Sequence, residues 1–307
     1  LYGVAPDRVV HAIGCSGANF LVMAAHLTAG DEVLMEWPGY DPMAGACRLL
    51  GATVRHFARP AETGFRADPD TIRRALTPHT RLVILTSPHN PSGAWLDQAT
   101  LEALDTLAAE TGVAILVDEA YLDLSRLLVL QAERSADVPR AATVGGGHLI
   151  STSSLTKSYG LNGLRCGWAV VPDAATANRL RRARDVIDGV GSAPVDRLAT
   201  LAFSHLPALG ARALAHAQSQ LSVARAFLDA HPALELRVPL QATITFPRLA
   251  GVEDAEAFAT MAARDFGVTV IPGRFFGAPA HVRLSLAGPA ANLRGGLAQL
   301  SRALAAR

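Results

Sequence analysis

Hydrophobic and polar positions follow two different periods along the first 170 residues of the chain. Short apolar runs rich in β-branched residues predict strands at residues 9–13, 32–36, 53–57, 81–86 and 113–117. Between these runs, apolar residues recur at helical spacing and predict helices that end near Gly30, Leu50, Leu76 and Thr111. Several strands are apolar at every position, as is typical of a parallel sheet buried on both faces. The pattern therefore predicts an α/β fold with a mostly parallel sheet covered by helices on both faces.

The pattern changes after about residue 207. A long helical segment runs to Ala230, and shorter elements alternate behind it. Strands are predicted at residues 243–246, 268–271 and 282–286, and helices at residues 255–265 and 289–306. This mixture is typical of a smaller α+β domain. We therefore expect a large domain over residues 1–205 and a small C-terminal domain over residues 206–307.

Composition narrows the kinds of partner that we expect. The chain has 307 residues, half of them hydrophobic, and a net charge of +1 with scattered arginines, so no basic stripe indicates a nucleic acid. Its apolar runs are far shorter than the roughly 20 residues that span a bilayer. Three widely spaced cysteines predict neither a disulfide framework nor a metal site. Since no charged and then apolar leader precedes the fold, we expect a cytoplasmic protein.

The segment Gly14-Cys15-Ser16-Gly17-Ala18 stands between a predicted strand and a predicted helix. Such a turn directs backbone N–H groups toward a helix N-terminus and favours a bound anion, to which the Ser16 hydroxyl can also donate. Two other interpretations stay open. The segment can be an ordinary tight turn, or it can be a hydrolase nucleophile elbow with Ser16 as nucleophile and His281 as a partner. Ala18 departs from the elbow pattern, which has a glycine there.

Asp118 ends an apolar strand, where a carboxylate is costly to bury without a positive partner. A protonated pyridine nitrogen is such a partner, and a carboxylate that keeps it protonated makes the ring an electron sink. Tyr121 follows three residues later, so both side chains face one way if the chain turns helically there. The alternative for Asp118 is an ordinary helix or turn cap.

Two further polar residues belong to this group of candidates. Asn90 stands in Pro88-His89-Asn90-Pro91-Ser92-Gly93, and its amide can donate to a phenolate oxygen. Arg283 stands on the predicted strand at residues 282–286, where its forked guanidinium suits a substrate carboxylate. Asn-Pro alone indicates only a turn, and a surface arginine is the common case.

Lys157 is the only lysine in the sequence. An amine must be neutral to attack an aldehyde, and burial or nearby cations favour its neutral form. Ser154 precedes it by three residues and Arg165 follows it by eight, and both can hold a phosphate. A lone surface lysine in a loop is the alternative. Because the candidates follow predicted strands, and ligands bind at the carboxyl ends of strands in such sheets, we expect one shared site.

Six short motifs occur along the chain in an order that is typical of one enzyme family: SGA, PGY, SPHNPSG, DEAY, SLTKSYGLNGLR and VRLSL. With these segments the chain resembles the class I/II aminotransferases of the fold-type I pyridoxal-phosphate enzymes, over essentially its whole length. The resemblance rests on the spacing from Asn90 to Asp118, from Asp118 to Tyr121 and from Lys157 to Arg165. It implies pyridoxal 5'-phosphate as cofactor, a homodimer, and transfer of an amino group from an amino acid to a 2-oxo acid.

The same resemblance implies a role for each candidate. Lys157 would form a Schiff base with the cofactor and then carry a proton, while Asp118 would pair with the ring nitrogen. Tyr121 and Asn90 would hold the 3-hydroxyl oxygen, and Tyr40 would stack on the ring. The substrate carboxylate would be bound by Arg283 with Asn90. The phosphate would be bound by Ser16, Gly17, Ala18, Ser154 and Arg165.

Two departures from the family pattern bear on activity. Relatives normally carry several dozen residues before the position of Leu1, including a strip over the substrate and a tyrosine that reaches the neighbouring subunit's phosphate. Ser153 replaces the arginine typical of members that act on histidinol phosphate, which disfavours a phosphorylated substrate. A decarboxylase, a carbon–sulfur lyase and an impaired truncated homologue stay open as alternatives.

The substrate side chain is less well defined by the sequence. We expect its pocket in the preceding segment and near Asn19, Phe20, Arg274 and Phe275. A neutral or aromatic amino acid is favoured, since no second well-placed arginine indicates a dicarboxylate.

Overall fold

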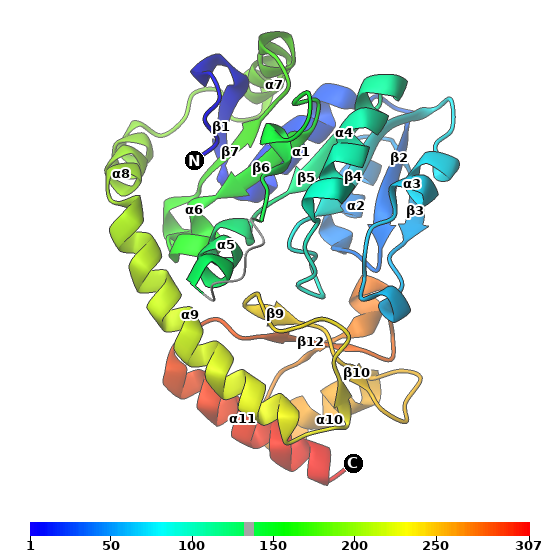
Figure 1. The fold of residues 1–307 in the computed structure, drawn as a ribbon, viewed down its shortest axis with the longest axis vertical. Coiled ribbons are helices and arrows are strands. Elements are labelled where there is room, and N and C mark those ends of the chain that lie inside the picture. Colours follow the sequence, from blue (N-terminus) through cyan, green and yellow to red (C-terminus); the bar gives the residue numbers. More distant parts are fainter. Residues whose placement is uncertain (132–137) are drawn as a thin grey trace.

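The computed structural model describes residues 1–131 and 138–307, and its larger lobe is built around one seven-stranded sheet (Figure 1). The strand order is β1-β7-β6-β5-β4-β2-β3. The strands are β1 (Val9–Ile13), β2 (Glu32–Trp37), β3 (Thr53–Ala58), β4 (Thr80–Thr86), β5 (Ala114–Asp118), β6 (Ile150–Ser154) and β7 (Cys166–Val170). Neighbouring strands pair in parallel except at β7, which is antiparallel to both β1 and β6. The predicted mostly parallel sheet is confirmed.

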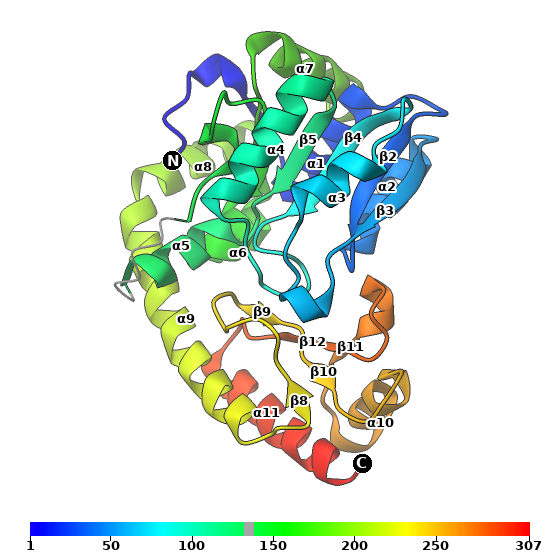
Figure 2. The same ribbon diagram turned by 45° about the vertical axis from the view of Figure 1, so that its right-hand side comes forward.

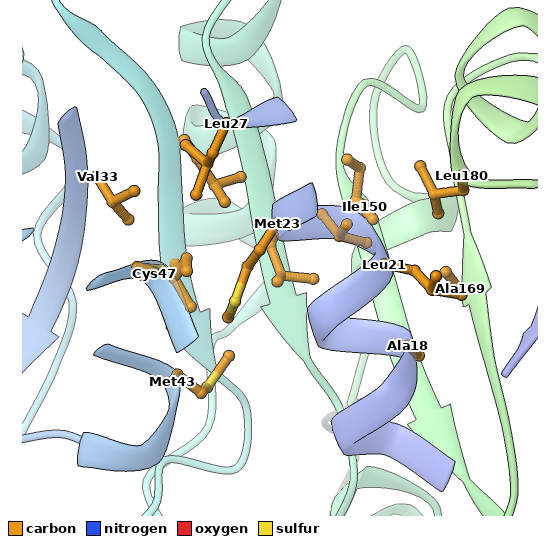
Figure 3. Packing of buried hydrophobic residues seen from close by; sticks show 14 of the residues in the cluster. Ala18, Leu21, Met23, Leu27, Val33, Met43, Cys47, Ile150, Ala169 and Leu180 are labelled. Carbon is orange, nitrogen blue, oxygen red and sulfur yellow. The ribbon is translucent and has the colours of Figure 1, made fainter. Parts of the chain in front are cut away.

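Helices cover both faces of this sheet, as the strands' apolar composition requires. One face packs against α1 (Gly14–His26), α2 (Asp41–Leu49) and α7 (Ala174–Ile187). The other face packs against α3 (Pro69–Ala75) and α4 (Gln98–Thr111), which lie in front of the strands in Figure 2. Figure 3 shows Leu21 of α1 close to Ile150 of β6 and Ala169 of β7. These contacts fix α1 against the strands that end at the candidate site.

The remaining helices of this half connect the sheet to the second lobe. They are α5 (Leu122–Gln131), α6 (Leu155–Tyr159), α8 (Ala193–Ser204) and α9 (Leu206–Asp229). With 24 residues, α9 runs past α5 and α6 and then along α11, as Figure 1 shows. Short 3₁₀ helices are η1 (Pro6–Arg8), η2 (Ala61–Thr63), η3 (Ala141–Thr143), η4 (Asn162–Leu164) and η5 (Gly273–Phe276).

The second lobe has two small antiparallel sheets with helices packed against them. Its sheets are β10-β8 and β11-β12-β9. Its elements are β8 (Leu234–Glu235), β9 (Ile244–Thr245), β10 (Arg248–Leu249), α10 (Glu256–Phe266), β11 (Ile271–Pro272), β12 (Val282–Ser285) and α11 (Ala290–Ala305). The strand predicted at residues 268–271 is wrong in extent. Gly267 ends α10 in the left-handed conformation, and pairing with β12 begins only at Ile271.

The parallel strands deliver their carboxyl ends to one edge of the large sheet. There β2 leads to the loop of Tyr40, β4 leads to Asn90, β5 ends at Asp118 and β6 leads to Lys157. β12 of the second lobe places Arg283 beside the same edge. Within residues 1–131 and 138–307, no helix is both long and apolar enough to cross a membrane.

Candidate active site

A cavity of about 270 Å³ lies at this edge and receives side chains from both lobes. Nearly all the candidate residues line it: Ser16, Tyr40, Asn90, Asp118, Tyr121, Ser154, Lys157, Arg165 and Arg283. The structure therefore brings together residues that are up to 267 positions apart in the sequence, counting from Ser16 to Arg283 (283 − 16).

Gly17 and Ala18 are the two candidates that do not line the cavity. The helix α1 starts at Gly14, earlier than the sequence pattern suggested. Only the N–H groups of the first helical turn lack a partner inside a helix, so this turn presents Cys15 and Ser16 instead. Ala18 is fully buried in the apolar core beneath α1. The expectation that these two residues contact a phosphate is therefore not supported by the geometry.

Asp118 reaches the cavity from the end of β5 and accepts three hydrogen bonds. Its Oδ1 accepts from the Ala120 N–H at 2.9 Å and from the Cys15 thiol at 3.3 Å. Its Oδ2 accepts from the Asn19 side-chain amide at 2.7 Å. Burial raises the pKa of the Asp118 carboxyl above its usual value, while these donors lower it. A positive ring nitrogen in the cavity would favour the ionised carboxylate further.

Lys157 projects into the cavity from the short helix α6, which Ser154 caps at its start and Gly160 ends. Its Nζ lies 5.6 Å from the centre of the Tyr121 ring. Partial burial and the positive charge of Arg283 lower the pKa of the Lys157 amine. The site thus favours the neutral, nucleophilic amine that reaction with an aldehyde requires.

Arg165 lines the cavity together with Ser16 and Ser154, and Gly14 makes room for its side chain. Both Gly14 and Arg165 have positive φ values, +69° and +50°, and the Gly14 N–H donates to the Arg165 carbonyl at 2.7 Å. The positive φ of Gly14 favours glycine, and a Cβ there would also lie 2.5 Å from a guanidinium nitrogen of Arg165 and displace it. Hydroxyl and guanidinium donors together suit a phosphate.

Arg283 and Asn90 join the two lobes across the cavity. The Arg283 Nη1 donates to the Asn90 Oδ1 at 3.0 Å, which leaves the Asn90 amide N–H groups to serve another acceptor. The Arg283 Nε is buried and has no hydrogen-bond partner among the residues that the structure describes. Burial raises the pKa of Tyr121 to about 12, so its hydroxyl stays protonated and can donate.

A buried network behind the cavity fixes the loop that carries Asn90. The Asn90 N–H donates to the Thr86 hydroxyl at 2.9 Å, and that hydroxyl donates to Glu36 at 2.5 Å. Glu36 in turn pairs with Arg59, whose side chain is fully buried, at 2.5 Å. The backbone of Asn90 is thus held by hydrogen bonds that lead back to Thr86 of β4 and Glu36 of β2.

Several contacts of the cavity were not predicted from the sequence. Cys15, Thr86, Pro88, Ala120 and Thr156 also line it. Thr156 lines the cavity, and its hydroxyl oxygen is buried with no hydrogen-bond partner within the described parts of the chain. Its position next to Lys157 was the signal that could have indicated it.

The residues expected near the substrate side chain lie elsewhere. Asn19 is buried beside Asp118, and Arg274 pairs with Glu256 and stacks on Phe275. Phe20 also does not line the cavity. The partner considered for a Ser16 hydrolase is absent from the site too, since His281 stacks on Phe246 in the second lobe. The geometry therefore gives no support to a hydrolase triad.

The donors and charges of the cavity match pyridoxal phosphate. Three cationic residues, Lys157, Arg165 and Arg283, line it, and Asp118 is the one carboxylate among its described lining residues. The positive charges suit the phosphate of the cofactor and the α-carboxylate of an amino acid. The hydroxyl of Ser16 and the guanidinium of Arg165 are lining groups that can donate to a phosphate. The fold and this cavity define a pyridoxal-phosphate enzyme of the α/β class.

Comparison with known proteins assigns the family. The family model described as "Aminotransferase class I and II" matches residues 1–300. The chain belongs to this family of pyridoxal-phosphate-dependent enzymes.

Similar proteins with names and solved structures agree with this assignment. Capreomycidine synthase of Streptomyces vinaceus is 34% identical over 97% of this chain and 75% of that protein. Arginine–pyruvate transaminase of Pseudomonas aeruginosa is 32% identical over 94% of this chain and 72% of that protein. A pyridoxal-phosphate-dependent aminotransferase from Streptococcus suis has a TM-score of 0.89 and 29% identity, with 99% of this chain and 78% of that chain covered.

Proposed function

We propose that the protein transfers an amino group from an amino acid to a 2-oxo acid, with Lys157 as the residue that binds pyridoxal phosphate covalently. The observation that carries this proposal is the position of the sequence's only lysine, which shares one cavity with Asp118 and Arg283. The bound cofactor supplies an electron sink that stabilises negative charge at the substrate Cα.

The residues of the chain have distinct roles in this proposal. Asp118 keeps the ring nitrogen protonated, and Tyr121 and the Asn90 amide donate to the 3-hydroxyl oxygen. Tyr40, at the mouth of the cavity, covers the ring face. Once the substrate amine has displaced it from the cofactor, the free Lys157 amine would be the base that accepts the proton from the substrate Cα. The phosphate is held by Ser16, Ser154 and Arg165.

Arg283 is proposed to bind the substrate α-carboxylate. Its position in the lining of the cavity and its bond to Asn90 support this role. The variant Arg283→Ala should raise the KM for the amino acid about 100-fold with a smaller change in kcat, because a charged hydrogen-bond partner of the substrate is lost. Steady-state kinetics measure this effect. An unchanged KM would reject the carboxylate role.

The two half-reactions test the proposed function. The protein is loaded with pyridoxal phosphate, and an amino acid is added alone. The visible band of the bound cofactor should disappear, and a 2-oxo acid added afterwards should restore it. If no proteinogenic amino acid bleaches the band, or if no oxo acid restores it, the proposed amino transfer is wrong.

A second candidate is a reaction on the amino acid without transfer to an oxo acid. It is favoured by the similarity to capreomycidine synthase, whose name describes a synthase. Such a reaction would consume many equivalents of amino acid in the absence of any oxo acid, whereas amino transfer stops after one equivalent. A decarboxylase would release carbon dioxide, and a carbon–sulfur lyase would release pyruvate and ammonia.

We propose a neutral or aromatic amino acid as the substrate. This proposal is supported by the charged lining residues, since all four already have roles toward the cofactor or the α-carboxylate. Relative rates with phenylalanine, leucine, aspartate and arginine test it. The similar arginine–pyruvate transaminase makes arginine the informative comparison, and a clear preference for arginine or aspartate would reject the proposal.

We propose that the active form is a homodimer. Large apolar side chains are exposed over α7 and α8, with Val186 87% and Val190 92% accessible and Leu198 and Leu201 more than half accessible. A second copy of the chain would cover this surface. The parent protein should sediment as a dimer, and the double variant Leu198→Arg, Leu201→Arg as a monomer. A monomeric parent would contradict the proposal.

Two further expectations are also kept as proposals. The small domain is placed at residues 206–307, supported by a separate cluster of buried apolar residues in α9, α10 and α11. Hydrogen exchange that shows one cooperative unit across residue 205 would reject this boundary. A cytoplasmic location is supported by three free cysteines, since reducing compartments keep thiols unpaired. Disulfides in protein isolated from cells would contradict it.

A further inference from the structure

Asn19 lies behind Asp118, on the side of the carboxylate away from solvent. It stands on the first turns of α1, which packs on β5, β6 and β7, and its side chain is 5% exposed. The Asn19 Nδ2 donates to the Asp118 Oδ2 at 2.7 Å. A carboxylate can only accept, so this contact fixes which end of the amide faces Asp118.

The other end of the amide is held as well. The Thr152 hydroxyl donates to the Asn19 Oδ1 at 2.5 Å. Thr152 and Asp118 are partners across the parallel pair of β5 and β6, so their side chains stand on the same face of the sheet. In the relay from Thr152 through Asn19 to Asp118, the Asn19 amide is therefore held at both ends.

These hydrogen bonds fix the orientation of the Asp118 carboxylate. Backbone Ala120 and the Cys15 thiol occupy Oδ1, and Asn19 occupies one lone pair of Oδ2. Asp118 remains partly exposed on its cavity side, where Lys157 and Tyr121 also point. All three donors act on the ionised form of the carboxylate and favour it over the neutral acid.

We propose that Asn19 is a positioning residue for the reaction: held by Thr152, it aims the Asp118 carboxylate at the cofactor's ring nitrogen and keeps that carboxylate ionised. This inference rests on the proposed role of Asp118. Asn19 itself touches neither cofactor nor substrate, and it acts only through Asp118.

A spectroscopic titration of the cofactor-loaded protein separates this role from a structural one. A protonated ring nitrogen withdraws electrons and so lowers the pKa of the nitrogen that Lys157 contributes. The pH midpoint at which the visible band shifts therefore reports on the Asp118 charge. Asp118→Asn should raise this midpoint by about one pH unit, and the near-isosteric Asn19→Leu should raise it by about half a unit, through the loss of one hydrogen bond to a charged group.

Further variants should shift the pH midpoint by different amounts. Thr152→Val should move the midpoint in the same direction as Asn19→Leu but less. In this variant the Asn19 amide is still present and loses only the hydrogen bond from Thr152 that orients it. The dissociation constant of pyridoxal phosphate should rise about fivefold in Asn19→Leu, as a weakened ion pair at the ring predicts. Ser151→Ala is the matched control: Ser151 is buried on the same strand but accepts from the Ala142 N–H. Ser151→Ala should leave the midpoint unchanged.

Each result decides between the two claims. If Asp118→Asn shifts the midpoint while Asn19→Leu and Thr152→Val leave it at the parent value, the positioning role is wrong and the role of Asp118 stands. If Asp118→Asn itself has no effect, the proposed ring contact is wrong and the inference falls with it. If Asn19→Leu does not fold, the Thr152→Val midpoint decides, and a value equal to that of Ser151→Ala overturns the inference.

Discussion

Asp118 and Glu119 are adjacent carboxylates at the end of β5, and their surroundings differ sharply. Asp118 faces the cavity and is partly exposed, whereas Glu119 is 1% exposed. The Glu119 Oε2 accepts from the Tyr2 hydroxyl at 2.9 Å, and its Oε1 accepts from the Ala141 N–H at 2.6 Å. Both oxygens of Glu119 are thus satisfied by the protein, while Asp118 keeps acceptor capacity toward the cavity.

The two carboxylates also differ in the charges around them. Asp118 has Lys157 nearby, which is the residue that we propose to bind the cofactor. Glu119 has the buried Arg140, which pairs with Asp123 and lies over the Tyr2 ring at 4.6 Å. Burial raises the pKa of Glu119 to about 7 in spite of this arginine. The comparison indicates that Asp118 serves a ligand, and that Glu119 fastens the start of the chain to the sheet.

The largest effect is expected for Asp118→Asn, which separates the role of Asp118 from that of Glu119. Amino transfer should fall about 100- to 1000-fold, because an uncharged amide cannot keep the ring nitrogen protonated and one charged partner of the reacting system is lost. The variant should still bind pyridoxal phosphate. Turnover numbers and an absorbance titration with cofactor check both parts. A rate near that of the parent would show that Asp118, like Glu119, has a structural role and none in the reaction.

The second expected effect concerns stability and pH. Glu119 ionises near pH 4.5 when unfolded and near pH 7 when folded, so the folded protein holds an extra proton between these values. Its contribution to stability is therefore present below pH 4.5 and is lost as pH rises to 7, by about 3 kcal/mol. Denaturant unfolding from pH 4 to pH 8 should show this slope in the parent and lack it in Glu119→Gln. Equal slopes in both proteins would refute the assignment.

The smallest effect is expected for Tyr2→Phe. This variant removes the hydroxyl that donates to Glu119 and keeps the ring beneath Arg140. The free energy of unfolding should fall by about 1 kcal/mol, the usual value of one such hydrogen bond. The amino transfer rate per folded molecule should not change. A loss of rate without a loss of stability would assign Tyr2 and Glu119 to the site instead.

Residues whose role depends on local sequence could be predicted before the structure. Five of the seven strands of the large sheet were predicted with the helices between them, because each reflects an apolar run of its own period. β6 and β7 were not predicted. Asp118 and Arg283 were found by their position after or on predicted strands, and Lys157 as the only lysine, between Ser154 and Arg165. All three meet in one cavity. The resemblance to the aminotransferases rested on the order and spacing of several motifs, and it assigned a role to each candidate residue.

Contacts that depend on packing between distant segments could not be predicted. Asn19 and Thr152 contact each other across 133 positions, and this contact exists only because α1 packs on β6. The start of α1 at Gly14 similarly decided that Cys15 faces the cavity and that Ala18 lies in the core. The strand at 268–271 failed because a glycine cap and irregular backbone intervene before pairing begins.

The central claim is that pyridoxal phosphate binds covalently to Lys157, and reduction with borohydride tests it most directly. Lys157 is the only lysine among residues 1–307, so one peptide of this segment can carry the label on a side-chain amine. After loading, reduction and digestion, mass spectrometry should find the pyridoxyl group on the peptide with Lys157, and Lys157→Arg should carry none. A pyridoxyl group found elsewhere, or no label on the folded, cofactor-loaded protein, would contradict the account.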